Sequence, residues 1–226
     1  MIKNQKEVLK KLDISGLNPM QKEVLAASKD CDNITLLSPT GSGKTLAFIL
    51  PLLERIDPTI RNTQALILVP SRELALQIEQ VIRQIGTGYK INALYGGRSV
   101  TKDKEDLLSP PVIVVGTPGR IADHIRNKRL STSDLEQLVL DEFDKSLEIG
   151  FENDLTFIID QLDLLRYRTL TSATTDQQIP MFVGHENELE INYLDKSCKS
   201  KLKTVMVEAP QTGKLQVLQE LVNKIA

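Results

Sequence analysis

The sequence has no tryptophan, few other aromatic residues, two cysteines and two histidines. Cys31 and Cys198 lie far apart and form no CxxC pair, which excludes a disulfide framework and, with so few histidines, a structural zinc site. No stretch approaches the roughly 18 apolar residues that a membrane-spanning helix needs. Several lysines near the N-terminus leave no apolar core for a signal peptide. We therefore expect a soluble, cytoplasmic protein with no membrane partner.

The chain also lacks an excess of either charge, since 28 basic and 30 acidic residues give a net charge of −2. With 41% hydrophobic residues it is too apolar and too nearly neutral to be disordered. At roughly 150 residues per domain, its length predicts one large domain or two small ones. The overall charge does not indicate a nucleic-acid binder, so local features must carry any such interpretation.

Short apolar runs, many of them β-branched, alternate with helical patterns along the chain. The runs that predict strands are 34–37, 65–69, 91–95, 112–115, 138–140, 169–171 and 204–207. Most are apolar throughout, which is typical of strands buried on both faces of a parallel sheet. Helices are predicted to begin at Asn18-Pro19, Lys44, Pro70-Ser71 and Thr117-Pro118, with a further apolar stripe over 155–162. The alternation predicts an α/β fold, a mostly parallel sheet with helices on both faces.

Two further features concern helix ends and connectors. Pro51 lies inside the helix that follows Lys44 and predicts a kink or an early end there. Near the C-terminus, the lysine-rich stretch 196–203 and the segment 208–213 are predicted connectors, the lysines forming a solvated loop rather than an RNA contact. A last helix is predicted from Lys214, with an apolar face that needs something to pack on.

Residues 38–45, Ser-Pro-Thr-Gly-Ser-Gly-Lys-Thr, follow a predicted strand and open a predicted helix, the context that a phosphate-binding loop requires. The two glycines let backbone amides turn toward phosphate oxygens, and the helix N-terminus adds partial positive charge. Lys44 can reach the β- and γ-phosphates, and the Thr45 hydroxyl can ligate Mg²⁺. The alternative is a glycine-rich turn with a chance lysine. Ser38 stands where the general pattern has its first glycine.

A second candidate is the acidic sequence that ends the strand at 138–140. Asp141 can hold Mg²⁺ through water, and Glu142 can polarise an attacking water. Ligands of open α/β sheets bind beyond the carboxyl ends of the strands, so this pair and the phosphate loop are predicted at one edge. The alternative is a solvated acidic turn; the pairing with a phosphate loop favours function.

Together these residues resemble the N-terminal RecA-like domain of a DEAD-box ATP-dependent RNA helicase, over almost the whole chain. The resemblance consists of short strings in the family's order: LNPMQ at 17–21 for the Q motif, SPTGSGKT at 38–45 for motif I, PSRELALQ at 70–77 for motif Ia, Gly96-Gly97, TPGR at 117–120 for motif Ib, DEFD at 141–144 and SAT at 172–174 for motif III. Each string alone is weak, whereas seven in order are highly specific.

The resemblance implies roles for these residues. Nucleotide binding would fall to Asn18, Gln21, Ser38, Pro39, Thr40, Gly41, Ser42, Gly43, Lys44 and Thr45, with Gln21 reading the adenine edge. Catalysis would fall to Lys44, Asp141 and Glu142, with Mg²⁺ held by Thr45 and Asp141. Ser172 and Thr174 would couple nucleotide state to RNA, with Asp144 hydrogen-bonded to that element. RNA phosphates and riboses would be contacted by Pro70, Arg72, Gly97, Thr117, Gly119 and Arg120, in a sequence-tolerant and salt-dependent manner, with ribose hydroxyls favouring RNA over DNA.

Structural alternatives exist for several of these residues. Gln21 could complete a capping box with Asn18, and Thr117 and Ser71 could be N-caps only. Arg72 and Arg120 could be solvated residues in first helical turns, although a cation there opposes the helix dipole. The order of the motifs favours the functional interpretation.

The chain also departs from the family pattern. Phe143 replaces a small alanine, Lys145 a common arginine, and Asn18 the usual threonine or serine. The aromatic residue that family members carry upstream of the Q motif is missing, which implies either a looser preference for adenine or a trimmed chain. Motifs IV to VI, which belong to the second RecA-like domain, have no counterpart. We therefore expect residues 1–207 to form the N-terminal domain, with the linker and first helix of a truncated second domain in 208–226.

The resulting hypothesis is the ATP- and RNA-binding half of a DEAD-box helicase, monomeric and weakly active alone, whose missing partner is the C-terminal RecA-like domain. Two other classes stay open. A DNA translocase would be distinguished by which polymer stimulates the ATPase. A non-enzymatic RNA clamp or scaffold would be distinguished by titrating ATP against the chain, and the intact Lys44, Thr45, Asp141 and Glu142 speak against it.

Overall fold

A computed structural model describes residues 5–175, 179–184, 188–194, 207, 209 and 213–225. The chain divides into two compact units, Met1–Lys196 and Ser197–Ala226. Among the described helices, none is long and apolar enough to cross a membrane.

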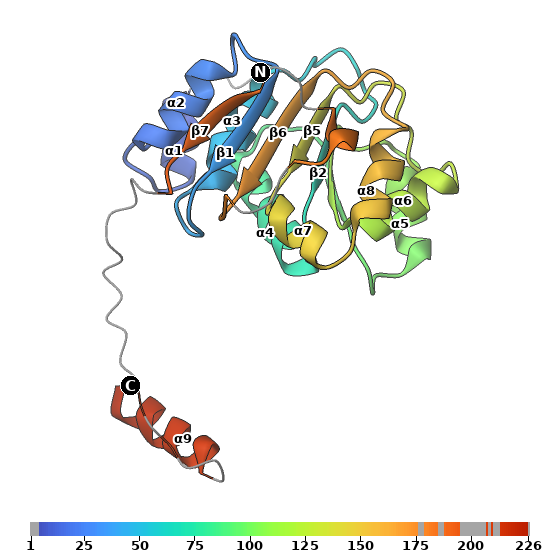
Figure 1. Cartoon of the computed structure of the whole chain (residues 1–226). Helices are drawn as coiled ribbons and strands as arrows, with labels where there is room; N and C mark the ends of the chain where they lie inside the picture. Colours follow the sequence, from blue (N-terminus) through green and yellow to red (C-terminus); the bar gives the residue numbers. More distant parts are fainter. Residues whose placement is uncertain are drawn as a thin grey trace. The chain divides into compact units, whose positions relative to one another are not determined.

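The first unit is built on a parallel sheet of the order β3-β4-β2-β5-β6-β1-β7 (Figure 1). The strands are β1 (Asn33–Leu37), β2 (Ala65–Leu68), β3 (Ile91–Leu94), β4 (Ile113–Gly116), β5 (Gln137–Leu140), β6 (Tyr167–Ser172) and β7 (Leu189–Asn192). The first six confirm the predicted strands within a few residues. In β2 to β5 every residue is buried, as expected of strands covered on both faces.

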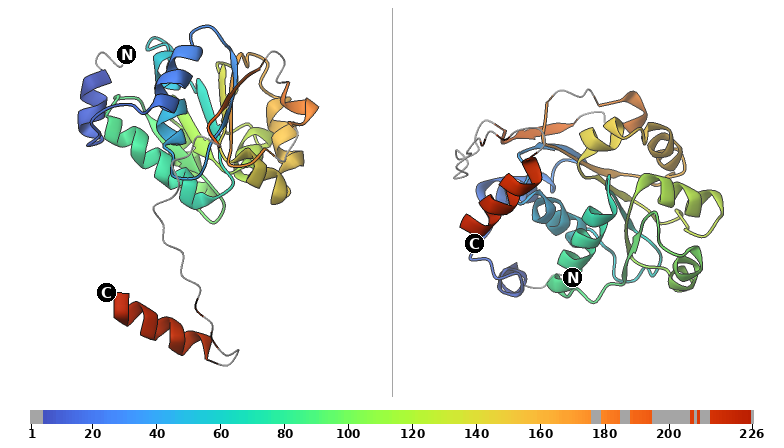
Figure 2. Two further views of the ribbon diagram at one scale, coloured as in Figure 1. Left: turned by 60° about the vertical axis from the view of Figure 1, so that its left-hand side comes forward. Right: turned by 90° about the horizontal axis from the view of Figure 1, so that it is seen from below.

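Helices cover both faces of this sheet, as Figure 2 shows from two further directions. One face is packed by α1 (Gln5–Lys11), α2 (Pro19–Ala27), α3 (Lys44–Glu54) and α4 (Arg72–Ile85). The opposite face is packed by α5 (Val100–Leu107), α6 (Pro118–Arg126), α7 (Phe143–Glu148), α8 (Glu152–Ile159) and the 3₁₀ turn η1 (Met181–Val183). Alternate residues of β2 therefore pack on opposite faces of the sheet. Ile67 lies in the core with residues of α3 and α4, whereas Leu66 and Leu68 lie in the core with residues of α6 and α8.

The predicted helix starts are confirmed, together with the capping serine and the first-turn prolines that predicted them. The Ser71 hydroxyl accepts a hydrogen bond from the amide of Leu74 at 3.2 Å and so caps α4. Proline occupies the first turn of α2 and α6, where its missing N–H has no partner to lose. Pro51 does not end α3, which continues to Glu54, less than one further turn.

Two strand predictions differ from the described structure. The edge strand β7 is not predicted, because its apolar residues Leu189 and Ile191 alternate with polar ones and form no continuous apolar run; three of its four residues are exposed. The predicted strand at 204–207 falls on residues that, apart from Val207, lie outside the described part of the chain, as do the lysines of 196–203.

The second unit contains α9 (Lys214–Ile225), which confirms the predicted last helix. Its apolar residues Leu215, Leu218 and Val222 are 80%, 58% and 57% exposed. This amphipathic helix therefore presents an uncovered apolar stripe.

Candidate nucleotide and polyanion site

The glycine-rich loop at 38–45 joins the carboxyl end of β1 to the first turn of α3. Gly41 and Gly43 have φ of +80° and +93°, the left-handed region that residues with a Cβ rarely adopt. The ammonium of Lys44 is buried and donates to the Ser38 carbonyl at 2.6 Å, and burial lowers the pKa of Lys44. Ser38, fully buried, shares a hydrogen bond of 2.6 Å with the Ser42 hydroxyl. The lysine is thus held inside the loop, where an anion would raise this pKa again.

The N-terminus of α2 holds this loop from one side. Asn18 and Gln21 form the capping box, with Gln21 N donating to Asn18 Oδ1 at 2.9 Å and Asn18 N donating to Gln21 Oε1 at 3.0 Å. The remaining amide groups reach the loop: Asn18 Nδ2 donates to the Ser42 carbonyl at 2.9 Å, and Gln21 Nε2 to the Gly43 carbonyl at 3.1 Å. The capping-box alternative for Gln21 is therefore confirmed, and the same two side chains also fix the phosphate loop.

Asp141, at the end of β5, is a buried carboxylate. Its Oδ1 accepts a hydrogen bond of 2.5 Å from the Thr171 hydroxyl. Burial raises the pKa of Asp141, while the hydrogen bond from Thr171 and the charge of Lys44 act in the opposite direction. A nearby metal cation would favour the ionised form in the same way as Lys44 does. With the Thr45 hydroxyl, Asp141 offers the hard oxygen donors that suit Mg²⁺.

Glu142 has an unusual backbone for a residue with a side chain, with φ 49° and ψ 51°. The conformation is held because the Glu142 amide donates to the Thr171 hydroxyl at 3.1 Å. Its side chain is only 10% exposed, and its carboxylate lies 2.9 Å from the ammonium of Lys145. Hydrogen bonding to Glu142 raises the pKa of Lys145. A left-handed glutamate at the end of a strand is a strained arrangement of the sort that clusters at functional sites.

The segment 172–174 connects this acidic pair to the phosphate loop. The Thr174 hydroxyl donates to Asp144 Oδ2 at 3.3 Å, which is the contact predicted between the acidic motif and the coupling element. The Ser172 hydroxyl donates to the Thr174 carbonyl at 2.8 Å, and the Ser172 carbonyl accepts from the Ser38 amide at 3.0 Å. The two motifs and the loop are therefore linked through main-chain and side-chain hydrogen bonds.

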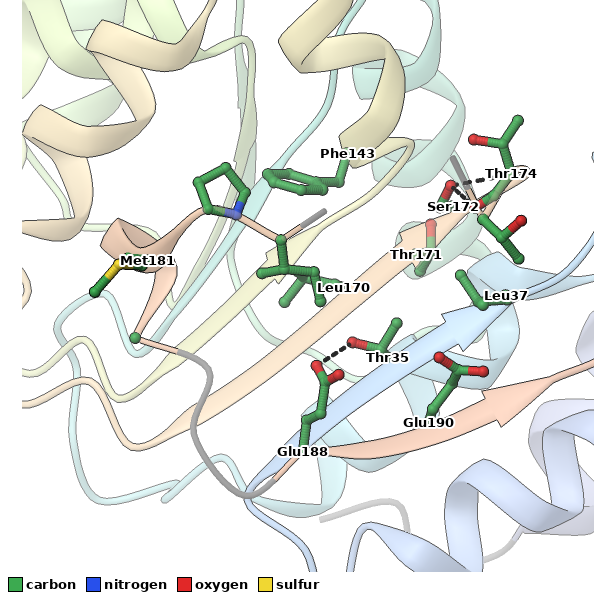
Figure 3. A pocket seen from close by; sticks show the side chains of 14 residues that line it. Thr35, Leu37, Phe143, Leu170, Thr171, Ser172, Thr174, Met181, Glu188 and Glu190 are labelled. Carbon is green, nitrogen blue, oxygen red and sulfur yellow. Dashed lines mark hydrogen bonds between the residues drawn. The ribbon is translucent and has the colours of Figure 1, made fainter. Parts of the chain in front are cut away.

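A cavity of about 500 Å³ lies beside this segment (Figure 3). It is bounded by Phe143 and by the β6 residues Leu170, Thr171 and Ser172. Phe143 itself is 3% exposed and packs in the core with β6 and α8, so its bulk fills space rather than crowding the carboxylates. The far rim carries Glu188, which accepts a hydrogen bond of 3.0 Å from Thr35, and Glu190.

The residues predicted to contact RNA lie at the same sheet edge, beyond the neighbouring strands β3, β4 and β2. They follow β2 (Pro70, Arg72), β3 (Gly97) and β4 (Thr117, Gly119, Arg120). Pro70 is buried, whereas Arg72 and Gly97 are exposed, Gly97 with φ +83°. Thr117 occupies the N-cap position of α6, but its side chain makes no capping hydrogen bond.

Two of these arginines differ sharply in environment. Arg72 is exposed, and its guanidinium lies over the ring of Tyr95, 5.6 Å from the centroid. The side chain of Arg120 is only 11% exposed and is paired with Asp103. The interpretation of Arg120 as an ordinary solvated residue is therefore wrong, because its partners enclose it.

Sequence reasoning missed several residues that shape this edge. Thr171, fully buried, holds both members of the acidic pair; a threonine in a buried strand just before the coupling motif is the signal that could have found it. Asp103 and His124, both fully buried, lie on helices whose charged neighbours hide them in the pattern.

The fold and this site define a RecA-like domain with a phosphate-binding loop. The sequence model of the DEAD/DEAH box helicase family matches residues 18–182, and the chain belongs to that family. The solved structures support the same fold. A DEAD box protein from the hyperthermophile Methanococcus jannaschii matches with a TM-score of 0.74 and 28% identity, over 97% of this chain and 61% of that one. A hypothetical ATP-dependent RNA helicase from Sulfolobus tokodaii matches with a TM-score of 0.72 and 28% identity, over 84% of this chain and 57% of that one.

Curated relatives are similar in sequence. The chain is 40% identical over 176 residues to the ATP-dependent RNA helicase DeaD of Klebsiella pneumoniae, covering 76% of this chain and 27% of that protein. It is 37% identical over 163 residues to the ATP-dependent RNA helicase CshA of Listeria monocytogenes, covering 71% of this chain and 31% of that protein. The chain thus spans about a third or less of the length of these relatives.

Proposed function

We propose that this chain is the ATP-binding and RNA-binding N-terminal half of an RNA helicase, in which ATP hydrolysis drives local duplex separation or remodelling of RNA–protein assemblies. The observation that carries the proposal is that the phosphate loop 38–45, the acidic pair Asp141 and Glu142, and the segment 172–174 meet at one sheet edge. Lys44 lies close enough to Asp141 and Glu142 for their charges to raise its pKa against the effect of burial. A phosphate loop facing two carboxylates at strand ends suits phosphoryl transfer to water.

In the proposed site the chain positions ATP and its attacking water. The amides of residues 41–45 and the Lys44 ammonium bind the phosphates, and Glu142 accepts a proton from the water. Mg²⁺, held by Asp141 and Thr45, would supply charge neutralisation at the β- and γ-phosphates. The side-chain amide of Gln21 already accepts one hydrogen bond at Oε1 and donates one from Nε2. Its second Oε1 lone pair and second Nε2 proton would bind adenine.

Coupling in this proposal runs through the segment after β6. Asp144 and Thr174 share a hydrogen bond of 3.3 Å, and Ser172 contacts the main chain of the phosphate loop. A shift of the acidic pair on hydrolysis would therefore move Ser172 and Thr174. The RNA-binding surface at the neighbouring strand ends would include Arg72, Gly97 and Thr117, contacting backbone phosphates and riboses with little sequence preference.

The proposal also includes a second RecA-like domain, of which residues 208–226 would form the linker and first helix. The exposed stripe of α9 is consistent with a helix whose packing partner belongs to that domain. An arginine supplied across the domain interface can accelerate phosphoryl transfer by about 10³–10⁵-fold. We therefore expect the 226-residue chain alone to hydrolyse ATP poorly and to separate no duplex; efficient unwinding by this chain would contradict the proposal.

The decisive experiment is an ATPase assay on a two-domain protein that carries this chain as its N-terminal half, with RNA, single-stranded DNA or no polymer added. We expect RNA to stimulate turnover most; stimulation by DNA alone would instead indicate a DNA translocase. Glu142→Gln should retain ATP binding and lower turnover at least about 100-fold, the contribution expected of a general base. Unchanged turnover would remove Glu142 from its role, and failure of the wild-type chain to bind ATP would indicate a scaffold.

A further inference from the structure

A buried carboxylate lies beneath the surface proposed for RNA. Asp103, on the inner face of α5, is fully buried although Lys102 and Lys104 on either side are exposed. Three nitrogens surround it: Arg98 Nε at 3.2 Å from Oδ1, Arg120 Nε at 3.2 Å from Oδ2 and His124 Nε2 at 3.0 Å from Oδ2. Such a carboxylate is retained at a high cost in desolvation, which its partners must offset.

His124 completes the cluster without adding charge. Its ring is fully buried, and burial lowers the pKa of His124 despite the hydrogen bond with Asp103. Because a carboxylate only accepts hydrogen bonds, the neutral ring carries its proton on Nε2. The cluster therefore consists of one carboxylate, two guanidinium groups and a neutral imidazole that fixes the position of Oδ2.

Arg120 connects this cluster to the turn that contains Gly96 and Gly97. Its Nε donates to the Tyr95 carbonyl at 3.2 Å, and its Nη2 donates to the Arg98 carbonyl. One guanidinium thus holds the residue before the two glycines and the residue after them. Arg98 is held in turn, since its Nη1 donates to the Ala93 carbonyl at 2.9 Å and its Nη2 pairs with Asp106.

The consequence concerns which groups face a polyanion. The side chain of Arg120 is 11% exposed, its Nε and Nη2 donate to carbonyls, and Nε forms an ion pair with Asp103. Arg120 therefore cannot turn toward a phosphate without giving up these contacts. Among the residues predicted to contact RNA, the exposed ones are Gly97 and Arg72, whose guanidinium lies over the ring of Tyr95. Their positions depend on the conformation of the turn at 95–98.

We infer that Asp103 is a positioning residue for RNA binding: through Arg120, it fixes the turn 95–98 that presents Gly97 and supports Arg72, while Arg120 itself acts as a clamp on that turn. The inference rests on the proposed RNA-binding function. It makes a prediction opposite to simple electrostatics, because removing a negative charge near a polyanion should strengthen binding, whereas loss of a positioning carboxylate should weaken it.

The test compares Asp103→Asn and Arg120→Lys with Asp123→Asn. Asp123 lies on α6 beside His124, is 42% exposed at its side chain and pairs with Arg129 at 2.8 Å, so its substitution removes the same charge away from the cluster. Binding of a fluorescent single-stranded RNA to the 226-residue chain is measured by anisotropy at low salt, and binding of a fluorescent ATP analogue reports on folding. Trypsin cleavage after Arg98, identified by mass spectrometry, reports on the turn itself.

We expect Asp103→Asn and Arg120→Lys to weaken RNA binding at least about fivefold and to speed cleavage after Arg98 at least about tenfold, with ATP-analogue binding unchanged. Asp123→Asn should match the wild type or bind RNA slightly more tightly. The inference is overturned if Asp103→Asn binds RNA as well as or better than the wild type, or if Arg120→Lys keeps wild-type affinity, as a direct phosphate contact would allow.

Two further outcomes are also informative. If Asp103→Asn loses ATP-analogue binding and is unfolded, Arg120→Lys, which keeps the positive charge, serves as the test. Weaker RNA binding and faster cleavage in Arg120→Lys support the clamp on the turn, and wild-type values overturn it. If the wild-type chain binds the ATP analogue but no RNA, the proposed function fails, and the cleavage rate after Arg98 alone decides whether Asp103 and Arg120 hold the turn.

Discussion

Thr171 offers a quantitative test of how the acidic pair is held. Its hydroxyl is fully buried, donates to Asp141 at 2.5 Å and accepts from the Glu142 amide at 3.1 Å. Thr171→Val keeps the shape of the side chain and removes both hydrogen bonds. A hydrogen bond to a charged group contributes about 1.5–3 kcal/mol, and a buried amide left without a partner costs about 1–3 kcal/mol. Because the two losses overlap, we expect the free energy of unfolding to fall by about 3 kcal/mol.

The assay is urea unfolding followed by far-UV circular dichroism, since the chain has no tryptophan to report by fluorescence. With a urea dependence of about 2–3 kcal/mol per molar, the midpoint should fall by about 1–1.5 M. The matched control is Thr169→Val, the same substitution two residues earlier on the same face of β6, where the side chain is 8% exposed. We expect the control to change stability by less than about 0.5 kcal/mol.

The effect should also depend on pH in a defined direction. Burial raises the pKa of Asp141, and loss of the Thr171 donor should raise it further. As the pH falls through that pKa, Asp141 becomes protonated and gains less from a hydrogen-bond donor. The difference in free energy of unfolding between wild type and variant should therefore narrow. Equal losses in Thr169→Val and Thr171→Val, or a gap that widens at low pH, would refute the reasoning.

The core and the buried imidazole provide two further predictions. Phe143→Ala, which installs the residue usual in the family, should cost about 3–5 kcal/mol in urea unfolding because Phe143 is 3% exposed in the core; an unchanged midpoint would show that the surrounding residues do not depend on its bulk. His124→Gln should flatten the dependence of the melting temperature on pH. Burial holds the pKa of His124 below its ordinary value of 6.5, so the unfolded chain takes up a proton at a higher pH than the folded one. The free energy of unfolding of the wild type therefore falls by up to about 1.4 kcal/mol per pH unit below pH 6.5. Identical pH profiles for wild type and variant, measured by circular dichroism between pH 7.5 and 5.5, would contradict this.

Much of the fold could be predicted because burial on both faces leaves a simple pattern. Strands such as 65–68 and 113–116 are apolar along their whole length, and helix caps such as Ser71 are local signals. The strand 189–192 was missed because it has no apolar run; the alternation of Leu189 and Ile191 with polar residues is the signal that could have found it. The helix 100–107 was also missed, because most of its residues are charged and only its two end residues are large and apolar.

The site was predictable where its residues are contiguous in sequence, as in the phosphate loop, and not where they meet only in space. The cluster of Asp103, Arg98, Arg120 and His124 joins residues from a turn and two helices. Nothing in the local sequence distinguishes a buried aspartate in a highly charged helix from a solvated one. The role that we infer for Arg120 therefore differs from the direct contact that the motif implies, because the side chain is only 11% exposed, which local sequence does not show.

The hydrogen bonds from Asn18 and Gln21 to the phosphate loop also bear on the thermodynamics of binding. They tie the carbonyls of Ser42 and Gly43 to the start of α2. Fixing the backbone of a residue costs about 1–2 kcal/mol in conformational entropy. Because these hydrogen bonds belong to the fold of the domain, part of that ordering is met by folding, and the proposed nucleotide binding would lose less of its affinity to restricting the chain.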